Sequence, residues 1–278
     1  MGTALSKDAR ARLDAAAAGS PSWRPYLDLV RAVLEEDASG RFDAVHVTLA
    51  DGRPADAPLL AGATVGVPER EAARFVAHVV GAKVAKRLDP VALLEAAARQ
   101  DAAALAATAG PAGVPADGLE ALAGLAVSPC LRACARTLAP RVPRPWPHGF
   151  CPVCGAWPAL AELRGLERER RLRCGRCAAD WGFSWLRCPH CGEADEKALS
   201  RLLLEGDGSG KSVETCGTCH GYLKSISTLS ALDPASLALA DLETVDLDLA
   251  AQQRGRRPPT SPAAPGSVRL VAAREARR

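Results

Sequence analysis

The sequence predicts an α + small β protein, in which an N-terminal helical bundle is followed by two tandem metal-binding ribbons. Three observations lead to this fold class. The 278 residues are 48% hydrophobic but only 4% aromatic, which favours a core of close-packed Ala-, Leu- and Val-rich helices. Apolar residues recur at helical spacing in the first half. Eight of the ten cysteines form four Cys-x-x-Cys pairs in the second half.

Residues 1–139 are predicted to form the helical domain. One helix is expected from residue 23 onward, because its apolar residues form a single stripe: Tyr26, Leu27, Val30, Val33 and Leu34. Further helices are expected at residues 68–87, 90–107 and 116–138, with short connections that suit an antiparallel bundle. Residues 41–50 allow a short strand, and the glycines and prolines that follow predict a loop.

Prolines and composition divide the rest of the chain. Residues 140–150 are predicted to be a connector, because clustered prolines cannot continue a helix: Pro140, Pro143, Pro145 and Pro147. A first metal ribbon is assigned to residues 151–185, and a second ribbon with a C-terminal helix to residues 186–257. The remaining residues, 258–278, are rich in Pro, Ala and Arg and are expected to be a flexible tail.

The four cysteine pairs predict two metal sites. Two thiolates separated by two residues can face one ion, and a second pair completes a tetrahedron. Sequential pairing, in which neighbouring pairs share an ion, is the simplest arrangement, and interleaved pairing is the alternative. The expected ligands are Cys151, Cys154, Cys174 and Cys177 at one site and Cys188, Cys191, Cys216 and Cys219 at the other.

The same spacing is compatible with more than one chemistry. Four thiolates accept zinc or a rubredoxin-like iron equally well, so two iron or zinc ions are predicted. A closed four-thiolate site favours a structural role. Thioredoxin-like dithiol chemistry is disfavoured, because no βαβ pattern surrounds any pair. His190 and His220 lie beside cysteines, but each site already has four donors. Cys130 and Cys134 share a helix face and are expected to be buried small hydrophobes.

Aromatic residues gather in the ribbon region. Trp181, Phe183 and Trp185 alternate along one predicted strand and are expected to pack over the metal sites, which would replace the large core that a small ribbon lacks.

Several function classes are excluded or disfavoured by composition. The opening residues contain no apolar signal region, and no sufficiently apolar membrane helix is seen, so a cytoplasmic protein without a membrane partner is expected. A net charge of +3 gives no general reason to expect nucleic acid as a partner. Because no catalytic constellation stands out, the protein is predicted not to be an enzyme.

The order of the cysteine motifs resembles the FdhE family, the formate dehydrogenase accessory proteins. The resemblance is carried by CPVCGAWP, LRCGRCAADW, LRCPHCGE and CGTCHGYLKSIS, which begin at residues 151, 172, 186 and 216. Tyr222-Leu223-Lys224 is the most telling part. In all, the resemblance covers roughly residues 20–260, and it is weaker in the helical half. Two departures are Ala178, where a ribbon has glycine, and the Arg-rich tail.

The resemblance implies a cytoplasmic maturation factor that is not an enzyme. Such a chaperone-like protein would be necessary for formate dehydrogenase activity and would bind the catalytic subunit of that enzyme. Its cysteine pairs, implicated in rubredoxin-like iron binding, carry over onto all eight cysteines of the four motifs. Two other functions remain alternatives: a nucleic-acid-binding zinc-ribbon protein, suggested by an arginine cluster at residues 164–176, and a rubredoxin-like electron carrier.

Overall fold

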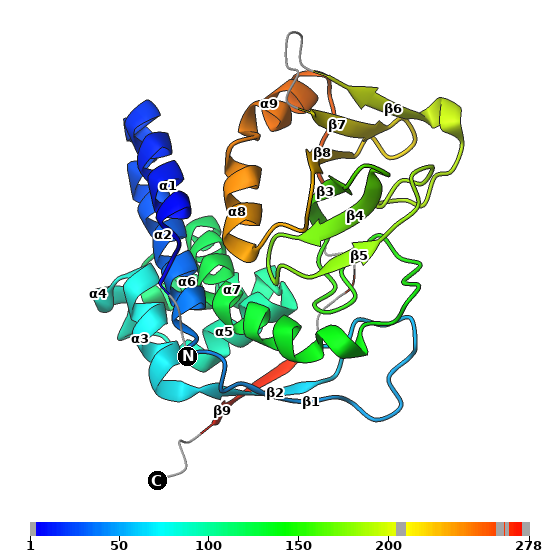
Figure 1. Cartoon of the computed structure of the whole chain (residues 1–278). Coiled ribbons are helices and arrows are strands. Elements are labelled where there is room, and N and C mark those ends of the chain that lie inside the picture. Colours follow the sequence, from blue (N-terminus) through cyan, green and yellow to red (C-terminus); the bar gives the residue numbers. More distant parts are fainter. Residues whose placement is uncertain (1–3, 204–209, 260–263, 265–266, 274–278) are drawn as a thin grey trace. The chain divides into compact units, whose positions relative to one another are not determined.

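The computed structural model describes residues 4–203, 210–259, 264 and 267–273. The chain folds into two compact units (Figure 1). Unit 1 comprises Met1–Pro54, Leu59–Arg141 and Pro265–Arg278, and unit 2 comprises Ala55–Pro58 and Val142–Ala264. The predicted mixture of helix and sheet is confirmed, but the arrangement of the strands differs from the expected one in both units.

Unit 1 is built around its longest helix. The helices are α1 (Lys7–Gly19), α2 (Arg24–Ser39), α3 (Glu69–Val80), α4 (Ala82–Ala85), α5 (Pro90–Arg99), α6 (Ala102–Ala112) and α7 (Ala116–Leu138). Helix α7 contacts α2, α3, α5 and α6 and is buried along most of its C-terminal half. Cys130 and Cys134 lie in this buried part, so their prediction as small core residues is confirmed.

Two predicted helices are each divided in the structure. The segment expected at residues 68–87 breaks at Gly81, whose φ of 87° suits glycine, and becomes α3 and α4. The segment expected at residues 90–107 breaks after Gln100. Asp101 then caps α6 by accepting a hydrogen bond from the backbone N–H of Ala104 at 2.9 Å.

Unit 1 also contains a three-stranded sheet, in the order β1-β2-β9, with β1 at His46–Thr48 and β2 at Thr64–Pro68. Strand β9 (Arg269–Ala273) pairs in parallel with β2. The expectation of a flexible tail at residues 258–278 is therefore wrong for this segment. The buried side chains of Val268 and Leu270 supply the apolar alternation that a strand requires. Residues 260–263, 265–266 and 274–278 of the predicted tail lie outside the described residues.

Unit 2 contains one six-stranded sheet rather than two separate ribbons. The strand order is β5-β4-β3-β8-β7-β6. The bounds are β3 (Pro158–Arg164), β4 (Glu169–Cys174), β5 (Asp180–Gly182), β6 (Leu199–Leu202), β7 (Lys211–Cys216) and β8 (Tyr222–Thr228). Strands β3 and β8 pair in parallel, and this pairing joins the two ribbon halves.

Two short helices cover one face of this sheet (Figure 1). Helix α8 (Pro234–Leu242) is preceded by Asp233, whose side chain caps the backbone N–H groups of the first turn. Helix α9 (Val245–Gln253) follows directly. Leu237 of α8 packs with Leu160 and Ile226, while Leu247 of α9 packs with Val213 and Tyr222. The sheet therefore has one covered face and one face free of these helices.

One helical segment among the described residues, Ala116–Arg141, is long and apolar enough to cross a membrane by length and composition. Within the structure, 67% of its most apolar window is buried. It also carries Arg132, which lies 3.4 Å from Asp37 of α2. A single buried helix of this kind is weak evidence for a membrane span, because core helices of the same length meet the same criterion.

Candidate metal centre

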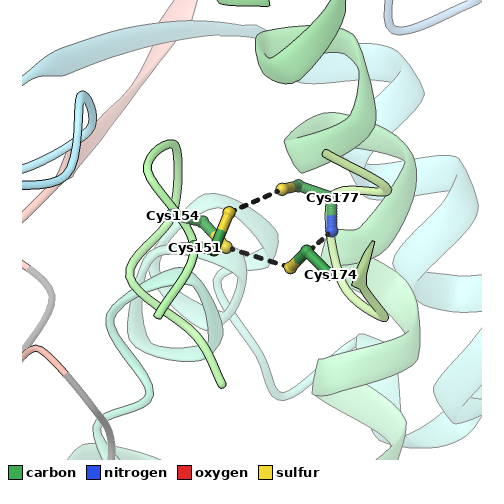
Figure 2. Close-up of side chains that lie close together, drawn as sticks. All are labelled: Cys151, Cys154, Cys174 and Cys177. Atoms are coloured by element: carbon green, nitrogen blue, oxygen red, sulfur yellow. Dashed lines mark hydrogen bonds between the residues drawn. The ribbon is translucent and has the colours of Figure 1, made fainter. Parts of the chain in front are cut away.

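The eight cysteines of the four motifs gather into two groups. One group contains Cys151, Cys154, Cys174 and Cys177, and the other contains Cys188, Cys191, Cys216 and Cys219. Within each group the sulfur atoms lie within 4.8 Å of one another. The structure therefore brings the cysteines together in the sequential arrangement rather than the interleaved one. Figure 2 shows the first group, with its two pairs facing each other across a small central space.

The sulfur–sulfur distances suit a tetrahedral metal site. Cys151 and Cys177 are separated by 3.5 Å, as are Cys154 and Cys174. The corresponding distances in the second group are 3.7 Å for Cys188–Cys219 and Cys191–Cys216. A metal–sulfur bond of about 2.3 Å in a tetrahedron requires sulfur atoms about 3.8 Å apart, whereas a disulfide requires about 2.05 Å. The donor set therefore fits a thiolate-bound ion, and no disulfide forms.

All four pairs adopt the same turn, which we call a knuckle. In each, the backbone N–H of the first cysteine donates to the carbonyl five residues later, at 2.8 to 3.0 Å: Cys151 to Ala156, Cys174 to Ala179, Cys188 to Glu193 and Cys216 to Gly221. The residue directly after the second cysteine has positive φ in every knuckle: Gly155, Ala178, Gly192 and His220. Glycine suits this position, yet Ala178 and His220 adopt it too. The departure at Ala178 therefore leaves the knuckle geometry unchanged.

Backbone amides also point at the sulfur atoms. The N–H of Val153 lies 3.4 Å from Cys151 Sγ, and the N–H of Gly221 lies 3.4 Å from Cys219 Sγ. Such N–H groups stabilise the thiolate form of a cysteine. Within the first group, hydrogen bonds from Cys151, Cys154 and Cys177 hold the pKa of Cys174 well below its usual range.

The two groups differ in their access to solvent. All four cysteines of the first group are buried, whereas Cys191 and Cys219 of the second group are exposed. The exposed Cys219 thiol is still partly desolvated by its neighbours, which raises its pKa to about 11. A chelator can approach the exposed sulfurs directly, but it reaches the first group only after the surrounding structure opens.

We expect the second group to lose its metal first. When the metal-loaded protein is mixed with excess chelator, half of the bound metal is expected to leave in a fast phase and half in a phase at least about tenfold slower, because the slow phase requires local opening. A Cys191→Ser variant should lack the fast phase. Release of both ions in one phase would contradict the assigned difference in access.

A buried ion pair between Glu162 and Arg173 contacts the first cysteine group through its second knuckle. Glu162 of β3 is fully buried and accepts hydrogen bonds from Arg173, from Arg164 at 2.7 Å and from the backbone N–H of Leu232 at 3.2 Å. Arg173 also donates to the carbonyl of Ala178 in the second knuckle, at 3.4 Å. Burial lowers the pKa of Arg173. Sequence reasoning missed this pair, since the residues are separated in sequence and each occurs among other charged residues.

Tyr222 and Lys224 connect the sheet to helices α8 and α9 through polar contacts. The Lys224 ammonium lies 2.6 Å from Asp241 of α8 and 2.8 Å from Asp248 of α9. The Tyr222 hydroxyl donates to Asp248 at 2.9 Å, and burial raises the pKa of Tyr222 to about 12. Both side chains are buried, as is that of Trp181.

The predicted aromatic strand is only partly formed. Strand β5 ends at Gly182, so Phe183 and Trp185 do not continue its alternation. Trp181 is buried and donates to the carbonyl of His148 at 3.2 Å, whereas Trp185 is 43% exposed. The three aromatic side chains therefore do not form one buried face.

The two histidines beside the cysteines have other partners. His190 Nε2 lies 3.1 Å from the carbonyl oxygen of Tyr222 and acts as the donor, and burial lowers the pKa of this side chain. His220 Nδ1 lies 3.4 Å from the guanidinium of Arg256. Neither residue belongs to either cysteine group in the described part of the chain.

The fold and the two four-cysteine groups define the class: a two-unit protein able to hold two thiolate-bound metal ions. No protein-family model matches the chain. Curated relatives, in contrast, match part of its sequence. The FdhE homologue of Stutzerimonas stutzeri is 40% identical over 122 residues, which cover 42% of this chain and 39% of that protein. The homologue of Aquifex aeolicus is 33% identical over 116 residues, covering 40% and 39% respectively.

A solved structure shares the fold across nearly the whole chain. The crystal structure of the FdhE protein from Pseudomonas aeruginosa has a TM-score of 0.57 and 23% sequence identity, and the match covers 95% of this chain and 98% of that one. The sequence matches, in contrast, span only about two fifths of the length of the curated relatives. The chain is therefore similar in sequence to FdhE homologues over about two fifths of its length, and similar in fold to an FdhE protein over nearly all of it.

Proposed function

We propose that the chain is a cytoplasmic accessory protein that is necessary for formate dehydrogenase activity and binds the catalytic subunit of that enzyme during maturation. The observation that carries the proposal is the series of four knuckles, which resembles the FdhE family and forms two four-cysteine groups. In this role the protein acts by binding and is not itself an enzyme.

We further propose that the eight cysteines ligate two ions, iron or zinc. The sulfur distances and the four identical knuckles support this assignment. A bound ion would crosslink two knuckles, and iron would in addition allow one-electron transfer. The chain contributes the backbone N–H groups that stabilise the thiolates and the sheet that fixes the knuckles. In this arrangement each ion stabilises one half of the sheet.

The nucleic-acid-binding alternative is less well supported. Four of the six arginines in the cluster at residues 164–176 are paired with carboxylates: Arg164 with Glu162 and Asp180, Arg170 with Glu214, Arg171 with Glu169 and Asp180, and Arg173 with Glu162. A nucleic-acid-binding face needs unpaired cations along a backbone track.

The proposed function predicts that deleting the gene abolishes formate oxidation in cells. A wild-type copy is expected to restore it, and a Cys188→Ser copy is expected to restore less than about a tenth, because loss of this ligand loosens the second group. A Cys134→Ala copy, which changes a cysteine outside the two groups, serves as the matched control and should restore activity fully. Affinity purification from the same cells should recover the catalytic subunit with the wild-type protein. Full formate dehydrogenase activity in the deletion strain would contradict the proposal.

A further inference from the structure

The sheet face opposite α8 and α9 carries a cavity beside the second cysteine group. The strand register places Arg201 next to Glu214, Glu214 next to Leu223, and Leu199 next to Cys216, so these residues share one face. The helices pack on the other face, against Val213 and Tyr222. The cavity has a volume of about 230 Å³, and residues of the knuckle at Cys188 form part of its lining.

The lining of this cavity combines apolar surface with positive charge. Its apolar part includes Leu199, Leu223 and the exposed indole of Trp185. Three arginines line it: Arg170, Arg187 and Arg201. Arg170 is neutralised by Glu214, to which it donates two hydrogen bonds.

The other two arginines lack a carboxylate partner among the described residues. The Arg201 guanidinium donates to the hydroxyls of Ser212 and Ser225, at 2.6 and 3.1 Å, and lies 5.8 Å from the centre of the Trp185 ring. Arg187 donates to the carbonyl of Gly192 at 3.4 Å. These neutral partners leave two exposed positive charges in the lining of a largely apolar cavity, so the complementary ligand is an anionic group joined to an apolar one.

The volume of the cavity and the charge of its lining favour a peptide over other ligands of this kind. At about 230 Å³ the cavity is smaller than the roughly 300–1,000 Å³ of sites for small molecules and cofactors, and it suits one large side chain. A nucleic-acid strand would need a longer basic track, but the neighbouring arginines of β4 are paired with carboxylates.

We propose that this cavity binds a partner peptide in which a large apolar side chain is flanked by acidic residues. The apolar side chain enters between Leu223 and Trp185, and the flanking carboxylates bind Arg187 and Arg201. Placed beside the second cysteine group, the peptide contacts the knuckle at Cys188 directly. This inference rests on the proposed partner-binding role, but its test contains no formate dehydrogenase, so failures of the two proposals are observed separately.

The test uses the full-length, metal-loaded protein and a fluorescein-labelled peptide with one phenylalanine between two pairs of aspartates. Fluorescence anisotropy at low ionic strength is expected to show binding at one site. Arg187→Gln, Arg201→Gln and Trp185→Ala should each weaken binding on the order of tenfold. Arg254→Gln, directly after α9, removes the same charge outside the cavity and should bind as wild type. Arg187 lies on an exposed loop, so its variant keeps the test valid if Arg201→Gln misfolds.

Three control ligands test the assigned chemistry of the cavity. A peptide with asparagines in place of the aspartates should bind weakly and equally to wild type and Arg187→Gln, and one with alanine in place of phenylalanine should lose its sensitivity to Trp185→Ala. Absence of peptide binding, or equal binding by all variants, would overturn the proposal. So would tighter binding of a ten-nucleotide oligothymidine strand that is lost in the same three variants, since that result assigns the cavity to nucleic acid.

Discussion

Replacing Cys174 by serine is expected to release the metal from the first cysteine group and to unfold the half of the unit 2 sheet that contains β3 and β4, while the helices of unit 1 stay folded. A structural thiolate site contributes about 10–16 kcal/mol to folding, which is comparable to the whole stability of a typical domain, about 5–15 kcal/mol. Cys174 is the last residue of β4, so an ion bound there would hold the end of the β3–β4 hairpin. Unit 1 has its own core around α7 and does not depend on that ion.

Hydrogen exchange followed by mass spectrometry measures this outcome. The amides of β3 and β4 should lose their protection in Cys174→Ser, while those of α2, α5 and α7 keep it. Cys134→Ala is the matched control, because it removes a buried thiol of α7 that belongs to neither group. Retained protection across β3 and β4 in the metal-depleted variant would show that the sheet is stable without the ion.

Glu162→Ala is expected to destabilise unit 2 by about 3–5 kcal/mol, the typical cost of leaving one charge of a buried pair without its partner. Arg173 stays buried, and its remaining hydrogen-bond partners are the carbonyls of Ala178 and Leu232. Asp180 is not hydrogen-bonded to Arg173, although its charge opposes the lowering of the Arg173 pKa by burial. Asp180 therefore offsets only part of the stability lost with Glu162. Urea unfolding, followed by tryptophan fluorescence, gives the change in the free energy of unfolding, because four of the five tryptophans, including the buried Trp181, belong to unit 2.

A neighbouring carboxylate provides the comparison for this variant. Glu169 of β4 also pairs with an arginine, Arg171 at 3.2 Å, but it is exposed to solvent. Glu169→Ala should therefore cost less than about 1 kcal/mol. A double variant with methionine at positions 162 and 173 should recover part of the stability, because it removes both buried charges. Equal effects of Glu162→Ala and Glu169→Ala would contradict the assigned importance of burial.

Local patterns in the sequence predicted the local structure well. The apolar stripe from Tyr26 to Leu34 predicted α2, and the predicted helix at residues 116–138 is α7. The four cysteine pairs predicted four knuckles and their grouping by sequence neighbourhood. Each of these features depends on residues close in sequence, where spacing determines which side chains share a face or a turn.

Long-range pairing was not predictable in the same way. The parallel contact of β3 with β8 merges two expected ribbons into one sheet, and nothing in either strand alone specifies its partner. Strand β9 pairs with β2, more than half the chain away, and its short apolar alternation was obscured by surrounding prolines and arginines. Nothing near Lys224 in the sequence predicted its burial, because lysine is rarely buried and the two aspartates that compensate its charge come from α8 and α9.

The measurement that tests the central claim most directly is native mass spectrometry of the intact protein purified without oxygen. The eight cysteines are predicted to hold two ions, so the wild-type mass should exceed the chain mass by two metal ions. A variant with Cys151 and Cys174 replaced by serine should retain one ion, as should a variant with Cys188 and Cys216 replaced. A wild-type protein that is folded and free of metal, or one in which either variant still holds two ions, would contradict the assignment.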